Sequence, residues 1–187
     1  MSAQAKQELS HSEEQAIAQL ESIVEMVAAL DRKSATIAYV KSLDDEQIQA
    51  LAIEASVIEP EDENLTVDNL RERILWEVEY SNFEPEGFEF DEEEAREMIQ
   101  EDPLSVQVRS DWYTLGADET ERAPAEFEIL LCTGGPAVRI VGDLDQGSPS
   151  RPRIQHQDWG TTWTEYFPSS EQREALQTYC EQFYFGD

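Results

Sequence analysis

Histidine and cysteine supply many of the general bases and nucleophiles of enzymes, and this chain contains two of each. His11 lies in a polar stretch near the N-terminus. His156 is close in sequence to Asp158, and a fold could bring it to Cys132 or Ser169. No nucleophile elbow, phosphate-binding loop, HExxH or CxxC motif accompanies it. We therefore predict that the chain is not an enzyme, and catalysis through His156 is kept as one alternative.

Metal and cofactor sites also lack their usual patterns. The stretch EDENLTVDN has the acids of a calcium loop without its central glycine, and DEEEAREMIQED is helical in pattern. Cys132 and Cys180 are too far apart for a zinc motif, which favours two buried free thiols. No metal and no cofactor is expected.

Carboxylates are the most concentrated chemical groups in the chain. Residues 83–103 read FEPEGFEFDEEEAREMIQEDP, and Arg96 is the only base among them. Residues four apart are neighbours on a helix, so Glu93, Glu97 and Glu101 are expected to form a row. The ten acids that we predict to bind a partner are Glu84, Glu86, Glu89, Asp91, Glu92, Glu93, Glu94, Glu97, Glu101 and Asp102.

Aromatic residues within this segment suggest that its charges are fixed in place. Phe83, Phe88 and Phe90 alternate with the acids, and we expect them to pin the segment to the core. Charges that are held in position lose less entropy on binding than charges on a disordered tail.

The whole chain is acidic, with 42 acidic and 13 basic residues and a net charge of −29. A magnitude of about 2 to 8 already keeps a small domain soluble, so solubility alone does not explain this charge. It disfavours direct binding to DNA, RNA and anionic membranes. It favours a basic, nucleic-acid-binding protein as the partner. A halophile-type acidic surface without a dedicated partner is the alternative.

Localisation follows from what the chain lacks. No stretch approaches the roughly 18 apolar residues of a membrane span. The start, MSAQAKQELSHSEEQ, has no apolar signal core. A cytoplasmic protein is therefore expected, and homo-oligomerisation stays open.

Helices must position the acids. Apolar residues at helical spacing predict an N-terminal helical region, with Ser12 as the N-cap of its first helix and a short helix over residues 37–43. Residues 59–65 break the pattern and are expected to form a loop. Further helices are expected to begin after Asp44, Thr66 and Asp91.

After Pro103 the apolar residues alternate, which is typical of strands. Turns are expected at TGGP and QGSPS, a polar strand at RPRIQHQD near an edge, and a capping box from Ser169 to Gln172 before a last helix. The predicted fold class is α+β. A helical, acidic region over residues 1–102 precedes an antiparallel β-meander with a C-terminal helix over 103–187, and the two can form one continuous domain.

Aromatic side chains give a second functional alternative. The segment DWGTTWTEYF is rich in them, and the sequence favours their burial under a loop over a contact surface. The alternative is an interaction module that binds a protein through Trp112, Trp159 and Trp163.

Four stretches of the second half carry a resemblance: DPLSVQVRSDWYTLG, AEFEILLCTGGPAVRIVGDLD, DWGTTWTEYF and YCEQFYFGD. They resemble small acidic proteins of uncharacterised function from bacterial accessory genomes, on plasmids, islands and prophages. The resemblance covers residues 102–187 and implies a mobile element, but no site residues. In charge alone, the chain is similar to the DNA mimics of such elements. We therefore predict a non-enzymatic DNA mimic that inhibits a restriction or CRISPR type of defence protein.

Overall fold

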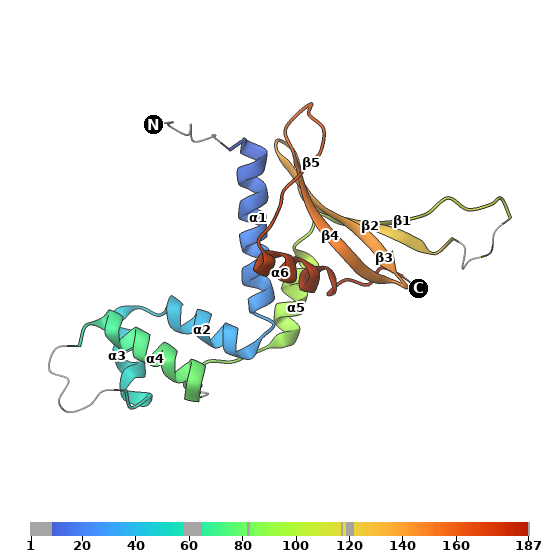
Figure 1. Cartoon of the computed structure of the whole chain (residues 1–187). Coiled ribbons are helices and arrows are strands. Elements are labelled where there is room, and N and C mark those ends of the chain that lie inside the picture. Colours follow the sequence, from blue (N-terminus) through green and yellow to red (C-terminus); the bar gives the residue numbers. More distant parts are fainter. Residues whose placement is uncertain (1–8, 58–64, 82, 117, 119–121, 187) are drawn as a thin grey trace. The chain divides into compact units, whose positions relative to one another are not determined.

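The computed structural model describes residues 9–57, 65–81, 83–116, 118 and 122–186. Within these ranges the chain forms six α-helices and one five-stranded antiparallel sheet (Figure 1), which confirms the α+β class. Contacts divide the chain into two compact units. We call Ala28–Ala95 the helical unit, and Met1–Val27 with Arg96–Asp187 the sheet unit.

Three helices make up the helical unit: α2 (Arg32–Ser42), α3 (Asp45–Glu54) and α4 (Val67–Ser81). Side-chain oxygens of Asp31, Asp44 and Thr66 accept hydrogen bonds from the backbone N–H three residues further on, which starts each helix. The expected starts after Asp44 and Thr66 are therefore confirmed. The loop expected at residues 59–65 lies, except for Leu65, outside the described residues.

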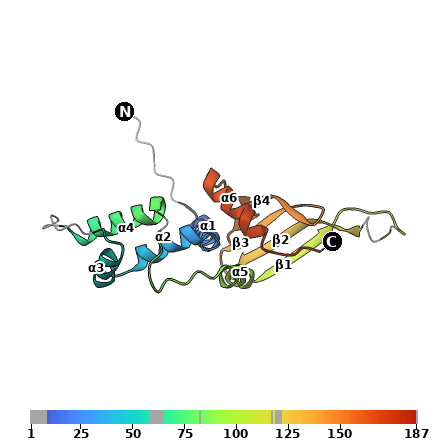
Figure 2. The ribbon, with the colours of Figure 1, turned by 90° about the horizontal axis from the view of Figure 1, so that it is seen from below.

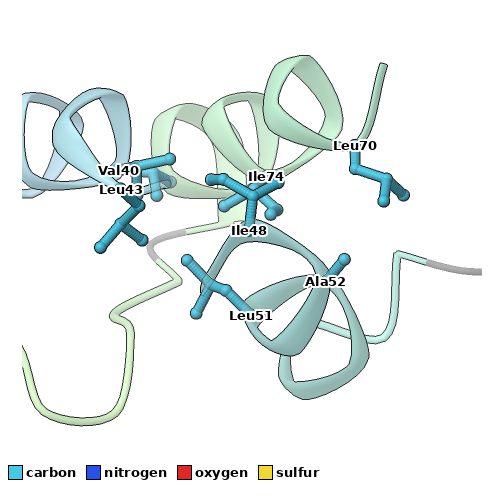
Figure 3. Close-up of a cluster of buried hydrophobic side chains, with 8 residues drawn as sticks. Val40, Leu43, Ile48, Leu51, Ala52, Leu70 and Ile74 are labelled. Atoms are coloured by element: carbon cyan, nitrogen blue, oxygen red, sulfur yellow. The ribbon is translucent and has the colours of Figure 1, made fainter. Parts of the chain in front are cut away.

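The core of the helical unit is an apolar cluster between these three helices (Figure 3). Each helix contributes the residues that recur at helical spacing in the sequence, so one face of each is buried. The cluster consists of Val40, Leu43, Ile48, Leu51, Ala52, Leu70, Ile74 and Val78.

The sheet follows the chain order, and each strand runs antiparallel to the one before it. Its strands are β1 (Ser105–Ser110), β2 (Pro124–Cys132), β3 (Ala137–Asp145), β4 (Ser148–Gln157) and β5 (Thr164–Glu165). Pairing aligns Val106, Ile129, Ile140 and Ile154 in one row on the core face. Because side chains alternate, the next row lies on the opposite face, which we call the open face.

Two details of the sheet depend on glycine and proline. The β3–β4 turn has Gln146 at φ 50° and Gly147 at φ 80°, as a two-residue hairpin turn requires. It lies within the predicted QGSPS turn. Pro152 can occupy β4 because β5 pairs only with Gln155 and His156, so the proline has no neighbour on that side.

The sheet unit also contains α1 (His11–Ala28) except for its last residue, the end of α5 (Glu92–Glu101) and α6 (Ser170–Cys180). α6 packs against β4 (Figure 2), and its Leu176 and Tyr179 are fully buried. The capping box predicted for Ser169 and Gln172 is present.

The first helix starts two residues earlier than predicted. Ser10 accepts the hydrogen bond from the Glu13 N–H, so Ser10 rather than Ser12 has the N-cap position. Ser12 lies in the first turn and is 2% exposed. Its hydroxyl is used elsewhere, as described below.

Candidate functional site

The first half of the acidic segment, residues 83–90, is held against the helical unit by its aromatic side chains. Phe83 packs on the apolar cluster. The ring of Phe88 lies 5.2 Å from the ring of Tyr39 on α2. Between these two contacts the backbone turns, because the Phe88 N–H donates to Pro85 O and Gly87 adopts φ 85°. The aromatic residues thus fix the segment, as the sequence predicts.

Charged groups add to this attachment. Arg32 donates to both carboxylate oxygens of Glu84 at 2.8 Å, and its guanidinium lies 5.2 Å from the Phe90 ring. The backbone N–H of Glu86 donates to Glu54 Oε1 at 2.6 Å. Each of these contacts joins the acidic segment to α2 or α3, so its carboxylates are carried by a folded support.

The second half of the acidic segment forms α5. Asp91 Oδ1 accepts hydrogen bonds from the N–H groups of Glu93 and Glu94 at 2.9 and 3.1 Å, so the predicted helix start is confirmed. Ala95 and Ile99 are 6% and 0% exposed. They are four residues apart, and the helix therefore buries one narrow apolar stripe.

A row of exposed carboxylates follows the outer side of α5. Glu93, Glu97 and Glu101 are all exposed and recur every four residues, which spaces them by about 6 Å along the helix axis. Like charges at this spacing destabilise a helix. The row is therefore not explained by the stability of α5.

The structure separates the ten predicted acids into two kinds. Glu84 and Asp91 make the contacts given above, and Asp102 accepts a hydrogen bond of 2.6 Å from the hydroxyl of Tyr179. These three help to build the fold. Glu92 also has an internal partner. In the part of the chain that the structure describes, no hydrogen bond or ion pair engages the side chains of the exposed residues Glu86, Glu89, Glu93, Glu94, Glu97 and Glu101.

The ten acids belong to both units, because the division between the units falls within α5. The seven acids from Glu84 to Glu94 belong to the helical unit. Glu97, Glu101 and Asp102 belong to the sheet unit.

Basic side chains of the helical unit are directed mainly at helix ends. Arg71 Nη1 donates to the carbonyl oxygens of Val40 and Leu43 at 2.9 and 3.0 Å, where α2 ends. Lys33 Nζ donates to the carbonyl oxygen of Glu79 in the last turn of α4. Cations are favoured at helix C-termini. These two cations are therefore used on backbone carbonyl oxygens and leave the acidic surface largely uncompensated.

His156 lies in a buried polar contact rather than on the surface. Ser12 Oγ is 2.9 Å from His156 Nδ1 and donates to Asp158 Oδ2 at 3.0 Å. Because the one hydroxyl proton goes to Asp158, Nδ1 carries a proton and donates to Ser12. A serine nucleophile would instead give its proton to the imidazole. The contact joins α1 to β4. No spacing pattern could predict it, because 144 positions separate the two residues.

The other partners considered for His156 are engaged elsewhere. Val138 pairs with Cys132 on one side and with His156 on the other, so these two residues are two strands, about 10 Å, apart. Burial raises the pKa of the Cys132 thiol, which disfavours the reactive thiolate. Ser169 caps α6. The structure thus places Asp158 close to His156. It places neither of the predicted nucleophiles, Cys132 and Ser169, beside the imidazole.

The segment DWGTTWTEYF is less buried than the sequence predicts. Trp159 and Phe167 are 86% and 81% exposed, so the expected burial under a loop is wrong for both. Trp163 is half-buried, because the guanidinium of Arg139 lies 4.1 Å from its ring.

Topology separates the three predicted tryptophans. Trp112 follows the end of β1, and Trp159 follows the end of β4. β1 and β4 run in opposite directions, so these residues follow opposite ends of the sheet, which are about 26 Å apart along β2. The three tryptophans therefore do not form one contact surface.

Among the described residues, no three or more His, Cys, Asp or Glu side chains are grouped so that they could hold a metal ion. Within the same ranges of the chain, no helix has the length and apolar content needed to cross a bilayer.

Comparison with protein-family models, curated proteins and solved structures gives no significant match. The resemblance to acidic proteins of bacterial mobile elements therefore remains a prediction from the sequence.

Proposed function

We propose that this chain is a non-enzymatic, acidic binding protein that acts as a DNA mimic. Its carboxylates would occupy the groove in which a basic partner binds nucleic acid. The partner class is a nucleic-acid-binding defence protein of the restriction or CRISPR type, and inhibition would follow from exclusion of the nucleic acid. Such a protein would act in the cytoplasm, where its target reads DNA or RNA.

One observation carries this proposal: exposed carboxylates are attached to a folded support, while two nearby cations, Lys33 and Arg71, donate to backbone carbonyl oxygens at helix ends. Ring contacts and the Arg32–Glu84 ion pair hold residues 83–90, and the Asp91 cap and buried Ile99 hold α5. A fixed charge array binds with a smaller entropy loss than a flexible acidic tail. It also speeds association with a basic surface.

Spacing supports the same function. DNA presents a phosphate about every 3.4 Å along each strand, and the row on α5 presents a carboxylate about every 6 Å. Lys and Arg side chains are long and flexible enough to adapt to this difference. The arrangement thus suits a protein surface evolved to contact phosphates.

The test begins with affinity capture from a bacterial lysate, followed by purified binding measurements. We expect the captured protein to bind nucleic acid, and excess duplex DNA to displace it from this chain. A variant with glutamine at Glu93, Glu94, Glu97 and Glu101 is expected to lose binding. The matched control carries glutamine at Glu21, Glu25, Glu171 and Glu174, four exposed acids of α1 and α6.

The control variant has the same net charge as the first variant, so the comparison separates position from total charge. Retained binding in the control supports the proposal. Equal loss in both variants would show that only bulk charge matters. A partner that DNA does not displace would contradict mimicry.

A second candidate function is supported by exposure in the sheet unit. Trp112 and Leu115, in the connection after β1, are 103% and 99% exposed. Exposed aromatic residues are typical of protein contact surfaces. Trp112 and Trp159 lie at opposite ends of the sheet, so one partner is expected to contact only one of them. Either Trp112→Ala or Trp159→Ala should therefore abolish this binding, and the other substitution should leave it unchanged. Binding that is unchanged in each variant would exclude this alternative.

A further inference from the structure

The open face of the sheet contains an arginine without a partner, in a chain where acids greatly outnumber bases. Arg153 on β4 is paired across the strands with Val141 and has no carboxylate beside it in that row. Within the described residues it makes no ion pair or hydrogen bond through its side chain. In so acidic a protein, an exposed arginine would be expected to form an ion pair with a carboxylate.

Three acids of the open face already have arginine partners. Glu126 pairs with Arg109, Glu128 pairs with Arg139, and Asp143 pairs with Arg151 at 2.7 Å. Arg153 is therefore one positive charge beyond the ion pairs formed on β1 to β4. Glu165, opposite Gln155 on β5, does not line the hollow described next.

Arg153 borders a hollow on this face with a volume of about 330 Å³. Arg109, Arg139, Glu126 and Glu128 also line it. The lining thus has three positive and two negative side chains, a net of +1, in a protein whose net charge is −29. The volume is at the lower end of the range for small-molecule sites.

Hydrogen-bond donors surround the hollow in a fixed arrangement. Arg139 donates from Nε to Gln155 Oε1 at 3.0 Å and lies on the Trp163 ring, so its position is set from three sides. Because Gln155 accepts through its oxygen, its amide NH₂ remains available as a donor. Gln107 lines the opposite wall on β1. These groups can donate to a ligand oxygen but offer few acceptors that are not already paired.

We propose that this hollow binds a small organic anion, with Arg153 as the group that pairs with its carboxylate or phosphate. A guanidinium presents two parallel N–H donors, which match the oxygens of either anion. Gln155 and Gln107 would donate the remaining hydrogen bonds, and Val141 would form the apolar floor. This site lies within the sheet unit and does not depend on the proposed DNA mimicry.

The test uses the full chain labelled with ¹⁵N, titrated separately with sodium phosphate and sodium acetate at constant ionic strength. Sodium chloride serves as the control for non-specific ions. We expect saturable shifts of the Arg153 Nε–H and Gln155 amide signals with one or both probes, and none with chloride. Saturation by phosphate alone assigns a phosphate ligand, and saturation by acetate alone assigns a carboxylate.

Variants locate the binding. Arg153→Gln is expected to weaken the binding of the probe by about tenfold or more, because a charged hydrogen bond is lost. Arg151→Gln is the matched control, since Arg151 is on the same strand but pairs with Asp143 and does not line the hollow. Val141→Phe should also block binding by filling the floor, while Arg153 is retained.

The proposal is overturned if neither probe gives a saturable shift, or if Arg153→Gln binds as tightly as the wild type. Equal weakening by Arg151→Gln would likewise overturn it, because the effect would then be one of total charge. The ¹⁵N spectrum of each variant shows whether its fold is intact. If Arg153→Gln is unfolded, the Val141→Phe titration decides.

Discussion

On helix α5, substitution can distinguish acids that serve binding from acids that serve stability. The perturbation is the double substitution Glu97→Gln and Glu101→Gln. Both residues are exposed, and they lie toward the C-terminal end of the helix, where negative charge opposes the helix dipole. If these acids serve a partner, their removal should weaken binding and at the same time make the protein more stable.

The magnitude follows from the spacing on α5. The double variant removes repulsions from Glu97 to Glu93, Glu94 and Glu101, each about 0.2–0.5 kcal/mol. It also removes the unfavourable position of Glu101 at the helix end, about 0.3–1 kcal/mol. The free energy of unfolding should therefore rise by about 1–2.5 kcal/mol at low ionic strength.

The matched variant, Glu93→Gln with Glu94→Gln, should behave differently. These acids are in the first turn, where they complement the helix dipole, and losing two such interactions costs about 0.6–2 kcal/mol. Relief of repulsion with Glu97 offsets part of this cost. A small decrease in the unfolding free energy is therefore expected, although binding should fall in both variants.

Urea unfolding followed by far-ultraviolet circular dichroism measures these changes at low salt and in 1 M NaCl. The stability gain of the first variant should shrink at high salt, because the Debye length is then only about 3 Å. A first variant that is no more stable than the wild type at low salt would refute the reasoning. So would a gain that does not depend on salt.

Three further predictions concern the sheet unit. Tyr179→Phe should lower the unfolding free energy by about 1.5–3 kcal/mol, since the hydrogen bond to the Asp102 carboxylate is lost. Burial and Asp102 also raise the Tyr179 pKa above its usual 10.0, so the stability of the wild type should fall above about pH 10 in urea titrations. The variant should lack this contribution of Tyr179 to the pH dependence. Ser12→Ala should cost about 1–3 kcal/mol in thermal unfolding, because two polar partners are left unpaired; an unchanged melting temperature would contradict the contact. Gly142→Ala should cost about 1–3 kcal/mol by calorimetry, because the new Cβ would lie 2.5 Å from the Phe127 ring; a more stable protein would show that the ring can move aside.

The sequence predicted the elements that depend on local physics. Apolar spacing indicated the helices, and side-chain oxygens at Asp44, Thr66, Asp91 and Ser169 marked four helix starts that the structure confirms. Alternation after Pro103 indicated the meander. These signals lie within a few residues of one another, so they can be read without knowledge of the tertiary fold.

Features that depend on contacts between residues far apart in the chain could not be predicted from the sequence. Ser10 and Ser12 are equally good caps in the sequence, and the choice between them depends on His156 and Asp158, far along the chain. β5 has two residues, too few to show an alternating pattern. The unpaired state of Arg153 follows from the strand register, which the sequence alone does not fix.

The candidate acids were found by composition, but their division into two kinds required contacts. Glu84 and Asp102 look like the other acids of the segment in the sequence. Only the positions of Arg32 and Tyr179 show that these two help to hold the fold. The burial of aromatic residues was similarly ambiguous, since Phe88 packs on Tyr39 whereas Trp159 is exposed.

The most direct measurement is the dissociation constant of the captured complex over a range of NaCl concentrations. We expect the logarithm of the association constant to fall steeply and linearly with the logarithm of salt, as for a phosphate backbone that contacts basic side chains. The slope should become shallower in the variant with glutamine at Glu93, Glu94, Glu97 and Glu101. An affinity that does not change with salt, or a slope that this variant leaves intact, would contradict the proposal that these carboxylates imitate nucleic acid.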